Sequence, residues 1–425
     1  MGDAAVRITG LSYGPHAIAR RDGKVLFVRA AVPGDEVEVA IREERRTFAY
    51  ADVTAVVQPS PDRRVPPCPY LPRCGGCPWQ HIDYAAQLRA KEKNVRDQLT
   101  RAVDLTHTDW RSISAAPAEF GYRHRLSLRV DHQQVGFFAG GTYELVPVTR
   151  CLLGEPLLDD AIPVAAEWTA QLRSAVNRIE IFAAADGQRW VFAGEASGTL
   201  ASADDAVCDA FLRARPRVAG LVLRAKRSRR AWGDERCALD LEPGLRWIVR
   251  AGTFTQVSRA GNRLLLQAVL DAGAFEPDQR VLELFAGAGN LSFPISRRVA
   301  RVVAVEQSEL AIEDGIANVR ALHETNCEFR SASAADGVAT ALRRGERYDV
   351  VVLDPPRSGA AEVMAALLEL APTRIVYVSC DPATLARDLR ALAARYHIAR
   401  VQPIDLFPQT YHVETVVLAT LKTLA

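Results

Sequence analysis

Cysteines at two places in the chain could carry chemistry, and the first place is the segment CPYLPRCGGCPW, residues 68–79. Cys68, Cys74 and Cys77 follow the spacing C-x5-C-x2-C, with prolines and glycines between them. In a reducing compartment, clustered cysteines are typical of metal ligands rather than disulfides. Three thiolates leave a four-coordinate site incomplete, so the segment predicts a fourth ligand elsewhere in the chain.

The second place is Cys380 in YVSCDPATLARDL, where a buried-strand pattern gives way to a helix pattern. Asp381 suits the N-cap of that helix and Pro382 its first position, while three leucines form an inward stripe. A thiol beside a helix N-terminus is expected to have a lowered pKa, which favours the nucleophilic thiolate. We predict that Cys380 is a catalytic nucleophile; the alternative is a cysteine packed as a small apolar residue.

A general base that could act together with Cys380 is predicted in DLFPQTYHVETVVLATL. This segment places His412 and Glu414 at the start of an apolar run. A carboxylate there is costly unless it is paired or functional. Addition of a thiolate to carbon 6 of uracil makes carbon 5 nucleophilic toward a methyl donor. A base must then remove the carbon 5 proton so that the thiol can leave. Glu414 is the predicted base, and a solvent-exposed strand-edge glutamate is the alternative.

A glycine-rich loop, ELFAGAGNLS at residues 283–292, follows another predicted strand. Gly287 and Gly289 allow a ligand to approach the backbone, although the third glycine of a dinucleotide loop is replaced by Ser292. Glu306 ends the next strand, where a carboxylate can bind both hydroxyls of a ribose. Together these features resemble the nucleoside site of class I methyltransferases, which bind S-adenosylmethionine. The alternative is a structural turn with a surface glutamate.

The elements that must position these residues differ along the chain. From about residue 260, the apolar runs RVLELFAG, RVVAVEQ, YDVVVLDPP and RIVYVSC alternate with helix-like stretches, which is typical of a doubly wound α/β domain. Short strand patterns with turn signals open the chain and predict a small five-stranded β-barrel. Mixed signals between them predict a central α+β domain that begins with a helix over DYAAQLRAKEKNVRDQLTR. The predicted domains are residues 1–60, 61–250 and 251–425.

Composition limits the classes of protein. The 425 residues, 48% of them hydrophobic, are enough for two or three domain cores. No apolar run is long enough to span a membrane and MGDAAVRITG lacks the features of a secretory signal, so we expect a cytoplasmic monomer with no membrane partner. The net charge of +2 is uninformative, but LRAKRSRRAW at residues 223–232 is strongly basic. This run is either a solvated loop or a phosphate-contacting patch.

Taken in order, the glycine loop, DPPRSG, YVSCDPATLARDL and FPQTYHVET resemble the RNA uracil-5-methyltransferase family over nearly the whole chain. The N-terminal barrel is similar to a TRAM domain, a small RNA-binding barrel. The resemblance implies that Cys380 is the nucleophile and Glu414 the base. It also implies that the family's cofactor or active-site positions are Gln256, Phe285, Gly287, Gly289, Asn290, Glu306 and Asp354.

Iron-sulfur members of this family carry the same C-x5-C-x2-C spacing and a remote fourth cysteine. The resemblance therefore implies a 4Fe-4S cluster on Cys68, Cys74, Cys77 and Cys151, the last of which lies in VPVTRCLLG. A structural zinc ion with the same four ligands is the alternative.

The segment FGYRHRLSLRV is similar to a Tyr-Arg motif that the family carries near its active site. Enzymes that modify a base in folded RNA hold the surrounding backbone with cations and stacking groups. Arg123 and Arg125 are expected to share one face of a strand, with Tyr122 adjacent, and these three residues are predicted to contact RNA. An exposed strand face with ordinary arginines is the alternative.

Two positions depart from the family pattern. Asp381 stands where the family usually has asparagine, and its charge is expected to oppose thiolate formation at Cys380. A polar cofactor contact after the predicted fourth strand would fall at Ser333 or Asp336.

The barrel and the cysteines are most similar to members that act on large-subunit (23S) ribosomal RNA, and the T-loop of transfer RNA is the second choice. A cytosine-5 RNA methyltransferase would share the thiolate chemistry but is expected to need a second cysteine near the site. An amino-group methyltransferase would have an aromatic residue where Arg357 stands. A non-catalytic RNA-binding protein would not need Cys380, Glu414 and the glycine loop together.

Overall fold

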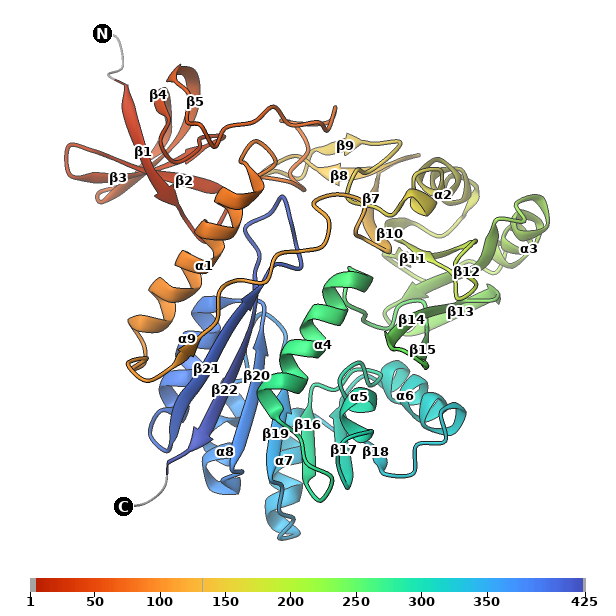
Figure 1. Cartoon of the computed structure of the whole chain (residues 1–425). Coiled ribbons are helices and arrows are strands. Elements are labelled where there is room, and N and C mark those ends of the chain that lie inside the picture. The colour runs from red at the N-terminus through yellow and green to blue at the C-terminus, as the bar shows by residue number, and fades with distance from the viewer. Residues whose placement is uncertain (1–4, 132, 423–425) are drawn as a thin grey trace.

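The computed structural model describes residues 5–131 and 133–422. Its three parts are a small barrel, a central sheet and a larger C-terminal sheet covered by helices (Figure 1). In these residues no helix is both long and apolar enough to cross a membrane.

The N-terminal part is a closed five-stranded barrel with the strand order β1-β2-β3-β5-β4, as predicted. Its strands alternate between the barrel interior and solvent, and the inward positions carry small or branched apolar residues such as Ala17, Leu26 and Ala49. The strands are β1 (Val6–Leu11), β2 (His16–Arg21), β3 (Lys24–Arg29), β4 (Glu36–Glu44) and β5 (Phe48–Gln58).

The central part is a seven-stranded sheet with the order β13-β12-β11-β10-β7-β8-β9. Helices α2 and α3 pack on it through a core that includes Trp168, Phe192 and Phe211. The elements are β7 (Arg125–Asp131), β8 (Gln134–Phe138), β9 (Leu145–Pro147), η1 (Pro156–Leu158), α2 (Ala161–Gln171), β10 (Val176–Ala183), β11 (Trp190–Ala196), α3 (Asp204–Ala214), β12 (Val218–Ala225) and β13 (Ser228–Gly233).

The basic run at residues 223–232 forms the β12–β13 hairpin. Arg224 pairs with Glu180 and Glu195, and Arg229 pairs with Glu235. Lys226 and Arg227 lie exposed at the tip of the hairpin. Most of the charge in this run is therefore used within the protein rather than presented as a phosphate-binding patch.

The C-terminal part is an eight-stranded sheet with the order β18-β17-β16-β19-β20-β22-β21-β6, parallel from β18 to β20 and antiparallel at β22. Its strands are buried on both faces, which confirms the predicted doubly wound domain. The elements are α4 (Arg259–Gly273), β16 (Arg280–Leu284), α5 (Ser292–Ser296), β17 (Arg301–Glu306), α6 (Glu309–Ala321), β18 (Cys327–Ser331), α7 (Ala334–Arg343), β19 (Val350–Leu353), η2 (Ala361–Val363), α8 (Met364–Leu370), β20 (Arg374–Ser379), α9 (Pro382–Leu392), β21 (Tyr396–Ile404) and β22 (Glu414–Leu421).

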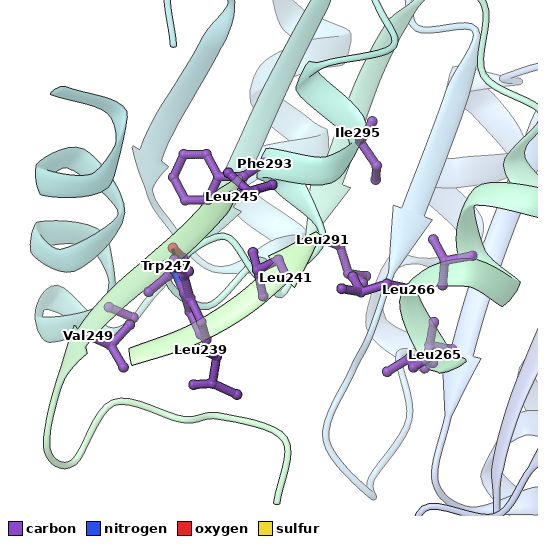
Figure 2. Packing of buried hydrophobic residues seen from close by; sticks show 14 of the residues in the cluster. Leu239, Leu241, Leu245, Trp247, Val249, Leu265, Leu266, Leu291, Phe293 and Ile295 are labelled. Atoms are coloured by element: carbon purple, nitrogen blue, oxygen red, sulfur yellow. Dashed lines mark hydrogen bonds between the residues drawn. The ribbon is translucent and has the colours of Figure 1, made fainter. Parts of the chain in front are cut away.

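Two segments that we assigned to the central domain pack with the C-terminal sheet instead. Helix α1 (Tyr84–Thr100), the helix expected after the cysteines, buries Val95 and Leu99 in the core beneath α9, and β6 (Asp109–Trp110) pairs with β21 at the sheet edge. The hairpin of β14 (Arg236–Glu242) and β15 (Leu245–Arg250) packs Leu239 and Trp247 against α4 and the segment after β16 (Figure 2). These segments pack with the C-terminal sheet because their apolar side chains are buried in its cores, although they precede it in the chain.

Candidate active site

The glycine loop after β16 borders a small cavity, partly open to solvent, at the carboxyl end of the sheet. In doubly wound sheets this end holds the ligand. Five of the seven residues predicted to bind the cofactor line the cavity. The five are Gln256, Phe285, Gly287, Asn290 and Asp354. Glu283 and Phe254 also line the cavity, although neither was predicted to bind the cofactor.

The loop's backbone conformation explains its glycines. Phe285, Gly287 and Gly289 all have positive φ, at 60°, 55° and 100°. A Cβ at Gly287 would meet nothing within 4 Å, so this glycine leaves open space for a ligand, whereas a Cβ at Gly289 would clash with Phe293. Gly287 therefore leaves room for a ligand beside the loop, whereas Gly289 allows Phe293 to pack against the backbone.

Buried side chains hold the loop in place from outside. The Trp247 indole donates a hydrogen bond of 2.8 Å to the carbonyl of Ala288, and Trp247 lies among the leucines of the β14–β15 hairpin (Figure 2). Asn262 of α4 and Asn290 of the loop exchange two amide hydrogen bonds of 2.7 and 2.9 Å. The cavity wall is thus fixed by both neighbouring elements.

Glu306, at the end of β17, lies beside the cavity rather than in its lining. Its carboxylate accepts hydrogen bonds from the backbone N–H groups of Gly287, Gln307 and Ser308. This places a carboxylate at the edge of the glycine loop, where a ribose would lie. Ser333 and Asp336 do not line the cavity: Ser333 is the N-cap of α7 and bonds to Asp336.

Tyr122, Arg123 and Arg125 do not form an exposed strand face, and their expected contact with RNA stays a prediction. The Tyr122 hydroxyl is buried and donates to the carbonyl of Pro408, while Arg125, with 14% of its side chain exposed, bonds to the carbonyl of Thr255 and to Glu180. Arg123 precedes β7, and its buried Nε has no hydrogen-bond partner. Glu180, distant in the sequence, draws Arg125 inward.

Residues of this stretch bond to the backbone of the segment that carries Gln256, a predicted cofactor residue. His124 lies between the two arginines, and its Nε2 donates a 2.6 Å hydrogen bond to the carbonyl of Gln256. Burial and the nearby Arg259 lower the pKa of His124 to about 3, so the ring stays neutral and keeps this donor.

Strand register brings Cys380 and Glu414 together. Ser379 and Thr415 are the last antiparallel pair of β20 and β22, so the next pair outward is Cys380 with Glu414. By alternation these two residues share the sheet face of Val378 and Val416, which belong to the core around α4. The predicted nucleophile and base are therefore neighbours on the face of the sheet that packs in the core with α4.

The electrostatics of Cys380 differ from the sequence-based expectation. Burial, then the charge of Glu414, raises the pKa of the thiol to about 12; Asp354 and Asp381 add to the rise and Arg357 opposes it. The helix that follows does begin at Pro382, with Asp381 as its N-cap. Burial among carboxylates outweighs the helix N-terminus, so the expected lowering of this pKa is wrong.

The two carboxylates of the site also titrate abnormally. Burial raises the pKa of Asp354 to about 7, and burial together with Asp354 raises that of Glu414 well above its usual range. One carboxylate oxygen of Glu414 is buried without a hydrogen-bond partner in the described residues. A buried carboxylate with a free oxygen and a raised pKa is suited to accept a proton near neutral pH.

A buried polar network holds the segment that leads to Glu414. Lys91 of α1 and Asp405, both fully buried, form an ion pair of 2.6 Å. Gln409, in a left-handed conformation with φ of 71°, exchanges hydrogen bonds with Gln87 and also accepts one from Arg64. Lys91 and Gln409 were not predicted as site residues, because their partners lie far away in the chain. The cavity residue Glu283, which bonds to Ser292, was not predicted either.

The four predicted cluster cysteines are brought together at the edge of the central sheet. The cysteine loop lies along β8, where Gly75 N–H donates to the carbonyl of Phe138, and Tyr70 bonds to Thr149 just before Cys151. Burial is the main cause of the raised pKa of Cys74, Cys77 and Cys151, and thiols of the same group raise each of them further. Cys68 is among those neighbouring thiols in every case.

The Asp381→Asn variant tests the departure from the family pattern. Asparagine caps a helix as well as aspartate does, but it removes a charge that raises the pKa of Cys380. The thiol should therefore ionise at lower pH, and addition of Cys380 to RNA at neutral pH should become about two- to threefold faster. The measurement is the rate of covalent adduct formation with 5-fluorouridine RNA between pH 6 and 9; a slower rate at neutral pH would contradict the expected sign.

Comparisons with known proteins show the family of this chain. The tRNA (Uracil-5-)-methyltransferase family matches residues 242–422, and the TRAM domain matches residues 5–54. A 23S rRNA (uracil(1939)-C(5))-methyltransferase of Pseudomonas entomophila is 34% identical over 94% of this chain and 90% of its own. An uncharacterized RNA methyltransferase of Thermosynechococcus vestitus is 34% identical over 98% of this chain and 97% of its own.

The crystal structure of Pyrococcus abyssi tRNA (uracil-54, C5)-methyltransferase with S-adenosyl-L-homocysteine has the same fold. Its TM-score is 0.75 at 22% sequence identity, over 98% of this chain and 99% of that chain.

The doubly wound sheet with its glycine loop and ligand cavity defines a class I methyltransferase that uses S-adenosylmethionine. The relatives place it more narrowly: the chain belongs to the RNA uracil-5-methyltransferase family and carries a TRAM domain. It is an S-adenosylmethionine-dependent RNA (uracil-5-)-methyltransferase.

Proposed function

We propose that this enzyme methylates carbon 5 of one uridine in 23S ribosomal RNA, with Cys380 as nucleophile and Glu414 as base. The observation that carries the catalytic assignment is the register of β20 and β22, which makes these two residues neighbours beside the cavity. The ribosomal target is supported by a relative with that activity, 34% identical over 94% of the chain. Such a substrate implies that the enzyme works in the cytoplasm.

The chemistry assigns a separate step to each residue. S-adenosylmethionine, when bound, supplies a methyl group on a positively charged sulfur. The Cys380 thiol gives up its proton to solvent, and the resulting thiolate adds to carbon 6 of uracil, which makes carbon 5 nucleophilic. Once carbon 5 carries the methyl group, Glu414 takes its proton, the carbon 5–carbon 6 double bond forms again and the bond to Cys380 breaks. Gln256, Phe285, Gly287, Asn290 and Asp354 would hold the donor in the cavity, with Glu306 at its edge.

Cys68, Cys74, Cys77 and Cys151 are proposed to hold a 4Fe-4S cluster. The donor set fits: all four are free thiols, and backbone N–H groups of Leu153 and Gly154 point at Cys151. Among the residues placed by the structure, no group of three or more His, Cys, Asp or Glu side chains is already arranged around a metal ion. A zinc ion on the same four thiolates is the alternative, and the metal content of the purified protein distinguishes the two.

The Cys151→Ala variant tests the remote fourth ligand. Purified without oxygen, the wild-type protein should contain about four iron atoms per chain and absorb broadly in the visible range. The variant should lose most of both, whereas Cys208→Ala, which removes a buried thiol from the central core, should keep them. Zinc in place of iron, or a full iron content in Cys151→Ala, would contradict the assignment.

The outer face of the barrel supports RNA as the partner. His16, Phe27, Phe48 and Tyr50 lie at outward positions of β2, β3 and β5, with ring centroids 5.2 to 6.4 Å apart. Partly exposed rings can stack on unpaired bases, and the exposed Arg29 beside them can contact phosphate. We place the barrel's RNA contact on this aromatic face.

The target is tested by labelling unmodified RNA with the purified enzyme. A 23S transcript and a transfer-RNA transcript are incubated with a methyl-labelled donor, and 5-methyluridine is mapped in each. We expect label at one uridine of the 23S transcript. Label confined to the T-loop of the transfer RNA would select that target instead, and methylated cytosine would reject the uracil assignment.

A further inference from the structure

The barrel reaches the predicted nucleophile through one side chain. Tyr13, in the turn between β1 and β2, donates a hydrogen bond of 2.6 Å from its hydroxyl to the backbone carbonyl of Cys380, 367 positions away. The barrel is closed by its own five strands, so a bond to the loop that carries Cys380 is not needed to close it.

The contact is part of a reciprocal interlock between the two domains. Tyr13 packs against the core of the C-terminal domain, while Tyr411, two residues before Val413, packs against the core of the barrel. Their rings meet edge to face, with centroids 5.7 Å apart. Each domain therefore inserts one tyrosine into the other beside the predicted active site.

A tryptophan clamps the turn that carries Tyr13. The buried Trp79 donates from its indole to the carbonyl of Gly14 at 3.1 Å, and its backbone N–H donates to the carbonyl of Gln409 at 3.1 Å. The turn is therefore tied to the segment that leads to Glu414 as well as to Cys380. This geometry leaves the Tyr13 hydroxyl little freedom to move away from the nucleophile.

The bonded carbonyl lies where the backbone needs a restraint. Cys380 follows the last residue of β20 and precedes α9, so neither ladder nor helix fixes it. The peptide between Cys380 and Asp381 is planar. Ser379 Oγ accepts from its N–H at 3.2 Å and Tyr13 donates to its carbonyl, so the peptide is held on both sides. Fixing this plane restrains the backbone that carries the Cys380 side chain and so limits the positions that the sulfur can reach.

We propose that Tyr13 is a positioning residue for Cys380, so that the barrel contributes to the rate of nucleophilic addition and not only to RNA binding. The inference rests on the proposed role of Cys380. The surroundings of the site also affect this hydroxyl. Burial and then the charges of Asp381 and Cys380 raise the pKa of Tyr13 above its ordinary value. The hydroxyl therefore stays protonated and remains a donor throughout the working pH range.

The test is Tyr13→Phe in the full-length protein, which keeps the ring and removes only the hydroxyl. We expect kcat and the rate of adduct formation with 5-fluorouridine RNA to fall about five- to tenfold, with the KM for RNA and the unfolding temperature little changed. Tyr13→Ala, which also removes the contact with Tyr411, should lose more. Tyr143→Phe, at a tyrosine that is 90% exposed, is the matched control and should behave as wild type.

Three outcomes would overturn the inference: unchanged kcat and adduct rate in Tyr13→Phe, a raised KM for RNA with unchanged kcat, or an equal loss in Tyr143→Phe. The second outcome would mean that the barrel serves binding alone. Adduct formation by Cys380→Ala would instead contradict the proposed function, and the kcat of Tyr13→Phe relative to wild type would still decide the role of Tyr13.

Discussion

The Cys380→Ala variant is expected to lose methyl transfer to RNA by roughly four orders of magnitude or more, because without addition at carbon 6 the uracil ring has no nucleophilic carbon. Donor binding should survive, since Cys380 does not line the cavity at the glycine loop. RNA binding should survive as well, since the aromatic face of the barrel is unchanged. The measurements are methyl incorporation and formation of a denaturation-resistant protein–RNA adduct with 5-fluorouridine RNA.

Two controls separate chemistry from folding. Cys208→Ala removes another buried thiol, in the core of the central domain, and should keep full activity. Cys380→Ser retains a polar side chain of similar size but should form no adduct, because a hydroxyl at this site is a much weaker nucleophile than a thiol. Methyl transfer by Cys380→Ala at more than a few per cent of the wild-type rate would remove Cys380 from the mechanism.

The raised pKa of Cys380 makes the resting nucleophile a thiol. A thiol resists oxidation better than a thiolate, so the raised pKa protects Cys380 from oxidation. Arg357 is the neighbouring cation that lowers this pKa, and its guanidinium bonds to His412 Nε2 at 3.3 Å. His412 stays neutral because burial, then Arg357, lowers its pKa to about 3. The site therefore keeps its positive charge on Arg357, which is exposed to solvent.

Local patterns predicted the elements that local forces determine. The N-cap at Asp381, the helix that begins at Pro382 and the buried parallel strands all follow from capping, proline geometry and apolar runs. The closed barrel follows in the same way from alternating short strands and turns. These features depend on residues within a few positions of one another, so one sequence is enough to find them.

The errors arose where long-range partners decide the outcome. Arg125 looked like a surface cation because Glu180, which pairs with it, lies on another strand. The pKa of Cys380 was judged from the adjacent helix alone, whereas Glu414 and Asp354 reach it only in the folded sheet. Nothing near Tyr13 in the sequence points to Cys380. Burial and charge at a site depend on the whole fold, so a local pattern can identify a residue's type of chemistry but not its surroundings.

The Glu414→Gln variant should stop the reaction after methylation and accumulate the methylated adduct on Cys380, even with ordinary uridine RNA. Glutamine has the same shape but cannot take the carbon 5 proton, so turnover should fall roughly 10²- to 10⁴-fold. Adduct formation should not slow, because the charge of Glu414 raises the pKa of Cys380 and its removal lowers that pKa. The measurement is methyl label that stays with the protein–RNA complex after denaturation.

The pH dependence gives a second, independent reading of the same residue. A base must be ionised to work, and Glu414 and Asp354 both have raised pKa values, that of Asp354 being about 7. Wild-type kcat should therefore rise with pH through the neutral range as this pair loses its protons. In Glu414→Gln, the accumulation of adduct should lack the part of the pH dependence that comes from ionisation of Glu414. Glu369→Gln, on the exposed side of α8, should keep the wild-type dependence of kcat on pH. Wild-type turnover in Glu414→Gln, or donor and RNA binding without any adduct, would mean that another group is the base.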